Sequence, residues 1–329
     1  MKLSRRRLLQ AAASTLIAPA MPATVRAQAF PSRQVTMVVP VPAGGALDTN
    51  ARLIAEGMRA ALGQPVIIEN VSGASGSIGT GRVARSAPDG YTLVYGANVT
   101  HCLNAAVYDL NYDVVADFAP VALIGWTPWL IVGKKDLPVN DLKGLIAWLK
   151  ANPDKGTCGT AGPGSPSHVA GVLFQKVTGT RFQFVPYRGV APVIPDLIGG
   201  NIDIAILDPI TTLPQIHAGR IKGFAMMAKS RTPTAPDIPT VDEGGAPGVY
   251  MEPWQAIFAP KGTPKDIVDK LNASVVGALA EPAIRKKFAD QSYELSPRDQ
   301  QTPEYLAKFQ KAEIDKWWPI IKAAGIKGG

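Results

Sequence analysis

From Phe30 onward, short apolar runs alternate with longer stretches whose apolar residues recur at helical spacing. Residues 35–41 and 66–69 each predict a buried strand, and residues 47–62 between them predict an amphipathic helix. This alternation is typical of α/β domains, in which helices cover a mostly parallel sheet. With 329 residues, 46% of them hydrophobic and 18% charged, the chain is long enough for two such domains and too apolar to be disordered.

The alternating pattern divides into two units. Residues 118–131 predict two strands separated near Thr127, and a second series of elements follows them. We expect a first lobe of residues 30–130 plus 255–329, and a second lobe of residues 131–254. Further strands are predicted at residues 92–95, 157–160, 182–185, 202–207, 224–228 and 254–259. Further helices are predicted at residues 77–86, 142–151, 167–177, 191–198, 264–280, 282–289 and 303–323.

The first 29 residues have the composition of an export signal. They hold five basic residues and no acidic one, and their apolar stretch at residues 8–20 is well short of the roughly 20 residues that span a bilayer. Residues 4–10 (SRRRLLQ) match a twin-arginine signal, which exports proteins that are already folded. Ala27-Gln28-Ala29 fits a cleavage site. We therefore expect a soluble, periplasmic mature chain that begins at Phe30 and has no lipid anchor.

Charge and residue counts exclude several function classes. Five of the net eight positive charges lie in this leader, so the rest of the chain carries +3 and lacks the basic signature of nucleic-acid binding. Two cysteines and three histidines, without an H-x-x-x-H or C-x-x-C motif, give no support to a metal site. Cys102 and Cys158 could form one disulfide after export. We expect two free, buried thiols instead, because a bond between the lobes would hinder their motion.

Glycine-rich loops follow the predicted strands where helices begin. Gly44 and Gly45 precede the helix at residues 47–62 and let the backbone approach a ligand without an obstructing Cβ. A loop at the carboxyl end of a strand, with free N–H groups at the start of the next helix, is a site for anions. Asp48 has the wrong charge for direct contact with a carboxylate. It is either a cap or dipole partner of the helix, or a group that orients water or meets an amine of the ligand.

Two other motifs resemble catalytic sites only superficially. The loop at residues 71–79 has the spacing G-x-x-G-x-x-G rather than the G-x-G-x-x-G of dinucleotide-binding folds. In the second lobe, Ser165, Ser167 and His168, with Asp208 downstream, lack the G-x-S-x-G nucleophile motif. We therefore predict that Ser165 and His168 cap a helix and hydrogen-bond a bound small ligand, rather than hydrolyse it.

Six sequence blocks in order along nearly the whole mature chain resemble a known family. The first, residues 42–52 (PAGGALDTNAR), is similar to the signature P-x-G-G-x-x-D-x-x-A-R, with Ala43 where the family often has proline. The second block, residues 69–93, departs from the family at Ser75, where glycine or a small residue is usual. The other four blocks lie at residues 104–121, 162–168, 185–189 and 239–254. Together they resemble the Bug-type solute receptors of tripartite tricarboxylate transporters.

This resemblance implies an α/β, two-lobed fold of the type II periplasmic-binding-protein (Venus-flytrap) kind. Hinge strands are expected near residues 129–132 and 254–259. The lobes would close on a small carboxylate (an amino acid, a di- or tricarboxylate or an aromatic acid), and a monomeric receptor would deliver it to a membrane permease without cofactor, metal or catalysis. The candidate ligand-binding residues are Gly44, Gly45, Ala46, Asp48, Gly73, Ala74, Ser75, Thr100, His101, Gly164, Ser165, His168, Arg188 and Asp208.

Alternative interpretations remain compatible with the sequence. An exported NAD(P)- or flavin-dependent oxidoreductase would fit the twin-arginine signal and a glycine-rich loop. A ligand-sensing receptor for a membrane kinase would use the same cleft as a transport receptor. Arg188 is either a ligand contact or a surface charge. Trp126, Trp129 and Trp254 are either core and hinge packing or, for one of them, part of the pocket.

Overall fold

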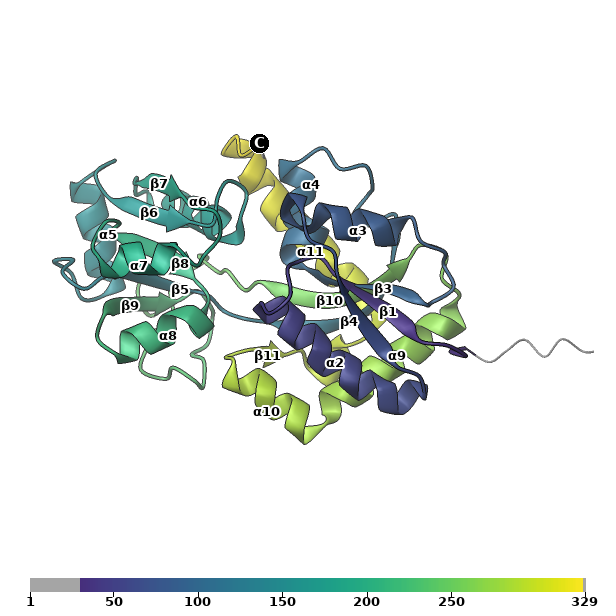
Figure 1. Cartoon of the computed structure of the whole chain (residues 1–329). Coiled ribbons are helices and arrows are strands. Elements are labelled where there is room, and N and C mark those ends of the chain that lie inside the picture. The colour runs from purple at the N-terminus through teal and green to yellow at the C-terminus, as the bar shows by residue number, and fades with distance from the viewer. Residues whose placement is uncertain (1–29, 328–329) are drawn as a thin grey trace, which may run out of the picture.

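The computed structural model describes residues 30–327, so the predicted export signal lies outside the described residues. Within this range two β-sheets, each flanked by helices, form two lobes that lie side by side (Figure 1). The predicted two-lobed α/β fold is confirmed. No helix within residues 30–327 combines the length and the apolar character needed to cross a bilayer.

The sheet of the first lobe has the strand order β11-β4-β10-β3-β1-β2. Its strands are β1 (Val35–Val39), β2 (Val66–Asn70), β3 (Thr92–Ala97), β4 (Phe118–Trp126), β10 (Trp254–Pro260) and β11 (Glu294–Leu295). Strand β1 is parallel to both β2 and β3, whereas β10 runs antiparallel to both β3 and β4. The chain therefore returns late in the sequence to complete the middle of the first sheet.

Helices cover both faces of this sheet. One face carries α2 (Ala46–Leu62), α9 (Lys265–Ala280) and α10 (Pro282–Asp290). The other face carries α3 (Ser77–Ala84), a π-helical turn (Val99–Leu103) that continues into α4 (Asn104–Val107), and the C-terminal α11 (Pro303–Ala323). Helices α2 and α9 pack closely because Gly57 faces Ala278: a Cβ on Gly57 would lie 2.4 Å from the Ala278 Cβ.

The sheet of the second lobe has the strand order β7-β6-β8-β5-β9. Its strands are β5 (Leu130–Lys134), β6 (Thr157–Thr160), β7 (Gln183–Pro186), β8 (Ile204–Leu207) and β9 (Ile221–Met226). Strands β6, β7 and β8 are parallel, and β5 is antiparallel to β8 and β9. Buried residues place α5 (Leu142–Ala151) and α6 (Pro166–Thr178) on one face, and α7 (Val193–Ile198) and α8 (Pro209–His217) on the other.

The chain crosses between the lobes in two neighbouring segments, which follow β4 and precede β10. The backbone N–H of Thr127 donates to the carbonyl of Pro253, and that of Trp129 donates to the carbonyl of Met251, both at 3.0 Å. These hydrogen bonds join the two crossing segments side by side, in the position of a hinge.

The expected hinge ranges lie mostly inside regular strands. Most of residues 129–132 belongs to β5, and residues 254–259 belong to β10 in the middle of the first sheet. Ladder hydrogen bonds fix the backbone of both strands. The crossing segments therefore border the two predicted ranges, and the first of them shares Trp129 with the range 129–132.

Candidate ligand-binding site

The carboxyl ends of β1 and β2 lie side by side at one edge of the first sheet. The two strands are parallel with Val39 opposite Asn70, and the N–H of Val71 donates to the carbonyl of Val39 at 3.0 Å. The loops that leave them, residues 40–45 and 71–76, are therefore neighbours, and most of their residues are exposed. Open α/β sheets bind ligands at this edge.

Asp48 organises the first loop. Its buried carboxylate accepts hydrogen bonds from Gly44 N (2.9 Å), Arg52 Nε (3.0 Å) and Asn70 Nδ2 (2.9 Å). Burial alone would raise the pKa of Asp48, but the hydrogen bonds from these three partners outweigh it and lower the pKa to about 2. Because both carboxylate oxygens of Asp48 already accept hydrogen bonds from the protein, its role as a structural partner of the helix fits better than a contact with the ligand. From the first turn of α2, Asp48 ties the first loop to β2.

The N-terminus of α2 is open to solvent. Its N-cap residue is Gly45, which has no side chain to accept from the first-turn amides, and Gly44, Gly45 and Ala46 are all exposed. Gly44 has a φ of 89°, in the left-handed region that favours glycine. Backbone N–H groups of this first turn lack intrahelical acceptors, so they can be offered to an anion.

The second loop contains two consecutive left-handed residues, Ala74 (φ 46°) and Ser75 (φ 53°). Each costs about 1–2 kcal/mol for a non-glycine residue, and such strain concentrates at functional sites. Gly73 and Gly76 flank the pair, and a Cβ on Gly76 would lie 3.0 Å from the carbonyl oxygen of Pro40. Glycine at this position therefore lets the second loop approach the end of β1 closely.

Two residues outside the predicted set hold the second loop in place. Asn104 Nδ2 donates to the carbonyl of Ser75 (3.0 Å) and to Ser77 Oγ (3.1 Å). The Tyr108 hydroxyl lies 3.1 Å from Ser75 Oγ, within hydrogen-bond distance. In the sequence, Asn104 and Tyr108 were marked only by their position in the family block at residues 104–121. That position did not indicate what either side chain contacts.

Thr100 and His101 lie behind the second loop rather than on it. Both are buried, and the ring of His101 stacks on Phe258 with centroids 4.1 Å apart. Burial lowers the pKa of His101 to about 3, so the ring is neutral. The sequence suggested His101 as a ligand contact. The structure encloses it in the core of the first lobe, because the backbone of Gly96 leaves room for its ring there.

The second lobe presents a comparable edge, formed by the carboxyl ends of β6, β7 and β8. Ser165 begins α6: its hydroxyl donates to the Gly162 carbonyl (2.6 Å) and accepts from His168 N (3.4 Å), so the predicted cap is confirmed. His168 Nδ1 accepts from Gly164 N at 3.1 Å, and burial lowers the pKa of His168. The ring is therefore an ordered, neutral group that keeps its Nε2–H for another partner.

Asp208 and Arg188 stand at the same edge. Asp208 caps α8 by accepting from Thr211 N at 2.9 Å, and burial raises its pKa. Arg188 follows β7, is exposed, and forms no hydrogen bond or ion pair with another residue of the described chain. The second lobe thus presents side chains at its edge, whereas the first lobe presents backbone amides.

The two edges meet through α4 of the first lobe. Val107, at the end of α4, contacts Gly164 in the loop after β6. Tyr108, the next residue, reaches Ser75 in the second loop of the first lobe. The structure therefore brings together the predicted residues of the two first-lobe loops at one edge of the first sheet. Helix α4 connects this edge to the second-lobe loop at residues 161–165.

The cysteines and the metal-type side chains of the described chain are the last groups to place. Cys102 and Cys158 are both free and buried, and burial raises both thiol pKa values, that of Cys158 to about 12. Across residues 30–327, no group of three or more His, Cys, Asp or Glu side chains is arranged to hold a metal ion.

Two α/β lobes joined by two crossing segments form the fold of periplasmic binding proteins, and the chain is similar to solved structures of that class. A family model described as "Tripartite tricarboxylate transporter family receptor" matches residues 50–326. The chain belongs to this family of receptors, as its six sequence blocks predicted.

Relatives and solved structures agree with this assignment. The chain is 40% identical over 312 residues to a protein encoded in the TAR-I ttuE-ttuC' intergenic region of Agrobacterium vitis, covering 94% of this chain and 90% of that one. MatC of Rhodopseudomonas palustris with bound malate is 36% identical with a TM-score of 0.77, covering 89% of this chain and 100% of that one. Rpa4515 of R. palustris with adipate is 35% identical with a TM-score of 0.79, covering 91% and 99%.

Proposed function

We propose that this protein is an exported receptor that captures a small carboxylate, with a dicarboxylate favoured, between its lobes and delivers it to a membrane permease. The observation that carries this proposal is the pair of adjacent, exposed first-lobe loops. One precedes the uncapped N-terminus of α2, and the other holds Ala74 and Ser75 in strained conformations. Malate and adipate in related structures are both dicarboxylates.

One carboxylate of the ligand is assigned to the amides around Gly45, Ala46 and Ala74, where fixed dipoles favour negative charge. Arg188 is assigned to a second carboxylate, because it is the exposed, unpaired cation of the second-lobe edge. A ligand that contacts both edges favours the closed arrangement of the lobes by its differential affinity. This mechanism needs no covalent step, so we expect binding without turnover.

A thermal-shift screen of the purified protein tests the proposal. The panel is malate, succinate, adipate, citrate, glutamate and benzoate, with hexanoate as the single-carboxylate match for adipate. A ligand at about 100 times its Kd stabilises the folded state by roughly 2.7 kcal/mol, which raises the melting temperature by several degrees. Stabilisation by a dicarboxylate is expected, and Arg188→Gln should reduce it more than it reduces any effect of hexanoate. A panel without any stabilising acid contradicts the proposal.

Export is tested separately. The leader motif at residues 4–10 supports passage through the twin-arginine route, with cleavage near Ala29. Replacing Arg5 and Arg6 by lysine should leave the full chain inside the cell, whereas the unaltered chain appears in the periplasmic fraction with Phe30 at its N-terminus. Equal export of both forms would exclude the twin-arginine route.

A further inference from the structure

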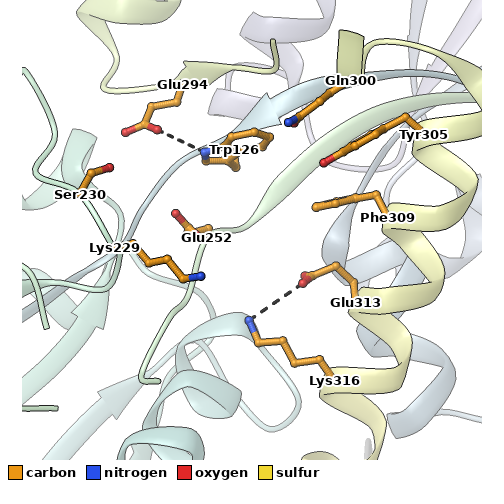
Figure 2. Close-up of a pocket in the computed structure, with 10 residues that line it drawn as sticks. All are labelled: Trp126, Lys229, Ser230, Glu252, Glu294, Gln300, Tyr305, Phe309, Glu313 and Lys316. Atoms are coloured by element: carbon orange, nitrogen blue, oxygen red, sulfur yellow. Dashed lines mark hydrogen bonds and ion pairs between the residues drawn. The ribbon is translucent and has the colours of Figure 1, made fainter. Parts of the chain in front are cut away.

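A cavity of about 510 Å³ lies beside the crossing segments and shares no residue with the loops described above (Figure 2); we call it the hinge cavity. Its walls come from the end of β4, the second-lobe segment after β9, the crossing segment before β10, β11 and the region of α11, including Gln300 just before it. The volume is within the range of about 300–1,000 Å³ typical of small-molecule sites. Because the walls come from elements that move against each other when the lobes close, a ligand here would contact the hinge directly.

Aromatic rings form one wall of this hinge cavity. Tyr305 and Phe309 lie one turn apart on α11, with nearly parallel rings whose centroids are 6.2 Å apart. Trp126, at the end of β4, lies across from them in Figure 2. The faces of such rings attract cations and pack against apolar groups.

A carboxylate without a partner faces the same space. Glu252 accepts no hydrogen bond and forms no ion pair with another residue of the described chain, although it is largely removed from solvent. The two other carboxylates of the wall are engaged: Glu294 accepts from Trp126 Nε1 (3.2 Å), and Glu313 accepts from both Trp254 Nε1 (3.2 Å) and Trp317 Nε1 (3.0 Å). Glu252 is thus an unpaired acceptor in a half-enclosed site.

The two lysines of the cavity are directed to other groups. Lys316 Nζ donates to the carbonyl of Tyr250 (3.3 Å), lies 4.0 Å from Glu313 and sits over the ring of Trp317. Lys229 Nζ lies 5.5 Å from the centroid of the Tyr250 ring. Neither lysine forms an ion pair with Glu252, and the three carboxylates of the wall outnumber the two lysines.

We propose that the hinge cavity binds a small organic ammonium ion with an aromatic or apolar body. The ammonium group lies between Glu252 and Glu294, and the body packs against Trp126, Tyr305 and Phe309. This site is independent of the proposed carboxylate site. Because its walls include residues of both lobes and the crossing segment before β10, occupancy would favour the lobe arrangement that keeps the cavity open.

Calorimetric titration with three ligands that share one ring tests the charge assignment. Tyramine carries an ammonium, hydroxyphenylpropionate carries a carboxylate, and tyrosine carries both. At about pH 8, above the pKa of about 7 of Glu252, tyramine is expected to bind the hinge cavity and hydroxyphenylpropionate is not. Because either acid can bind the proposed carboxylate site, only binding that Phe309→Leu weakens is attributed to the hinge cavity. Absence of tyramine binding overturns the proposal, and so does hydroxyphenylpropionate or tyrosine binding that is tighter than that of tyramine and is weakened by Phe309→Leu.

Two variants test the site assignment. Glu252→Gln removes one charge and should weaken tyramine about tenfold, as expected for a lost charge-assisted hydrogen bond. Phe309→Leu removes an aromatic face and should also weaken it. Glu56→Gln is the matched control: it makes the same chemical change on the exposed side of α2 and should bind tyramine like the unaltered protein. Circular dichroism verifies that each variant is folded, and unchanged affinity in folded Glu252→Gln overturns the assignment.

Protonation gives an independent readout. Burial raises the pKa of Glu252 to about 7, and the charges of Glu294 and Glu313 add to the rise, against the opposing charges of Lys316 and Lys229. The affinity for tyramine should therefore fall several-fold between about pH 8 and pH 6 in the unaltered protein, and much less in Glu252→Gln. An equal fall in both proteins contradicts the role of Glu252.

Discussion

Gly164 of the second lobe lies so close to Val107 of the first that a Cβ on the glycine would sit 2.6 Å from Val107 Cγ1. Gly164 also has a φ of 73°, so both its conformation and its surroundings favour glycine. Val107 precedes Tyr108, which is within hydrogen-bond distance of Ser75. One contact between the lobes therefore connects the second-lobe loop to the strained loop of the first lobe.

Gly164→Ala should weaken ligand binding by keeping the lobes apart. The added methyl group meets a stiff, β-branched side chain, and overpacking of this kind costs about 1–3 kcal/mol, which corresponds to roughly five- to 150-fold in affinity. Gly179→Ala is the matched control, because Gly179 also has a positive φ (65°) but has open space at its Cβ position. Isothermal titration with the tightest-binding acid of the panel measures both. Equal losses in the two variants would attribute the effect to backbone strain alone.

Asp48→Asn should destabilise the first loop. An amide cannot accept all three hydrogen bonds that the carboxylate receives, and we expect a loss of about 1–3 kcal/mol in the free energy of unfolding at neutral pH. The pKa of Asp48 is lowered from 3.8 to about 2, so its contribution is present above pH 3.8 and is lost as the pH falls through 2. Urea unfolding at several pH values measures this difference.

Asp269→Asn is the control for Asp48→Asn. Asp269 is exposed on α9 and pairs with Lys265, so this variant makes the same chemical change in a surface ion pair. Surface pairs of this kind contribute little. If Asp48→Asn and Asp269→Asn have the same stability at neutral pH, Asp48 does not hold the loop.

Both thiols should resist modification in the folded protein. Cys102 and Cys158 are buried, and burial raises their pKa values, which suppresses the reactive thiolate. A thiol-reactive chromophore at mildly alkaline pH should label neither residue until denaturant is added, when two thiols per chain become reactive. Rapid labelling before unfolding would contradict the burial of these thiols in the native state.

Most of the fold could be predicted because its apolar periodicity is regular. The helices predicted at residues 142–151 and 303–323 and the strand at 157–160 match the structure residue for residue. Helix α8 escaped prediction because Pro209 and Pro214 indicate a loop. In the structure Pro209 opens the helix behind the Asp208 cap, and Pro214 lies inside it. Strand β11 has two residues, too few for a periodic signal.

The site could be predicted less completely, because sequence shows which loops are glycine-rich but not what packs behind them. Gly44, Gly73 and Gly76 indicated the first-lobe loops, whose positive φ values require glycine. The enclosure of His101 against Phe258 depends on a contact between distant parts of the chain. The hinge cavity joins β4, the crossing segment before β10 and α11, and no local pattern brings them together.

Glu252→Gln should stabilise the protein at alkaline pH and not at acidic pH. Burial raises the pKa of Glu252 from 4.5 to about 7, with the charge of Glu294 adding to it, so the folded state binds more protons than the unfolded state between these values. The stability of the unaltered protein therefore decreases as the pH rises through this window. Glutamine carries no charge and escapes this penalty. We expect the free energy of unfolding of the variant to exceed that of the unaltered protein by about 2 kcal/mol at about pH 8, and by little at about pH 5.

Urea unfolding of both proteins at the two pH values measures the gain, and the exposed control Glu56→Gln should show no gain. A variant that is no more stable than the unaltered protein at about pH 8 would mean that the cavity already neutralises Glu252, which would also remove the physical reason for an ammonium ligand there.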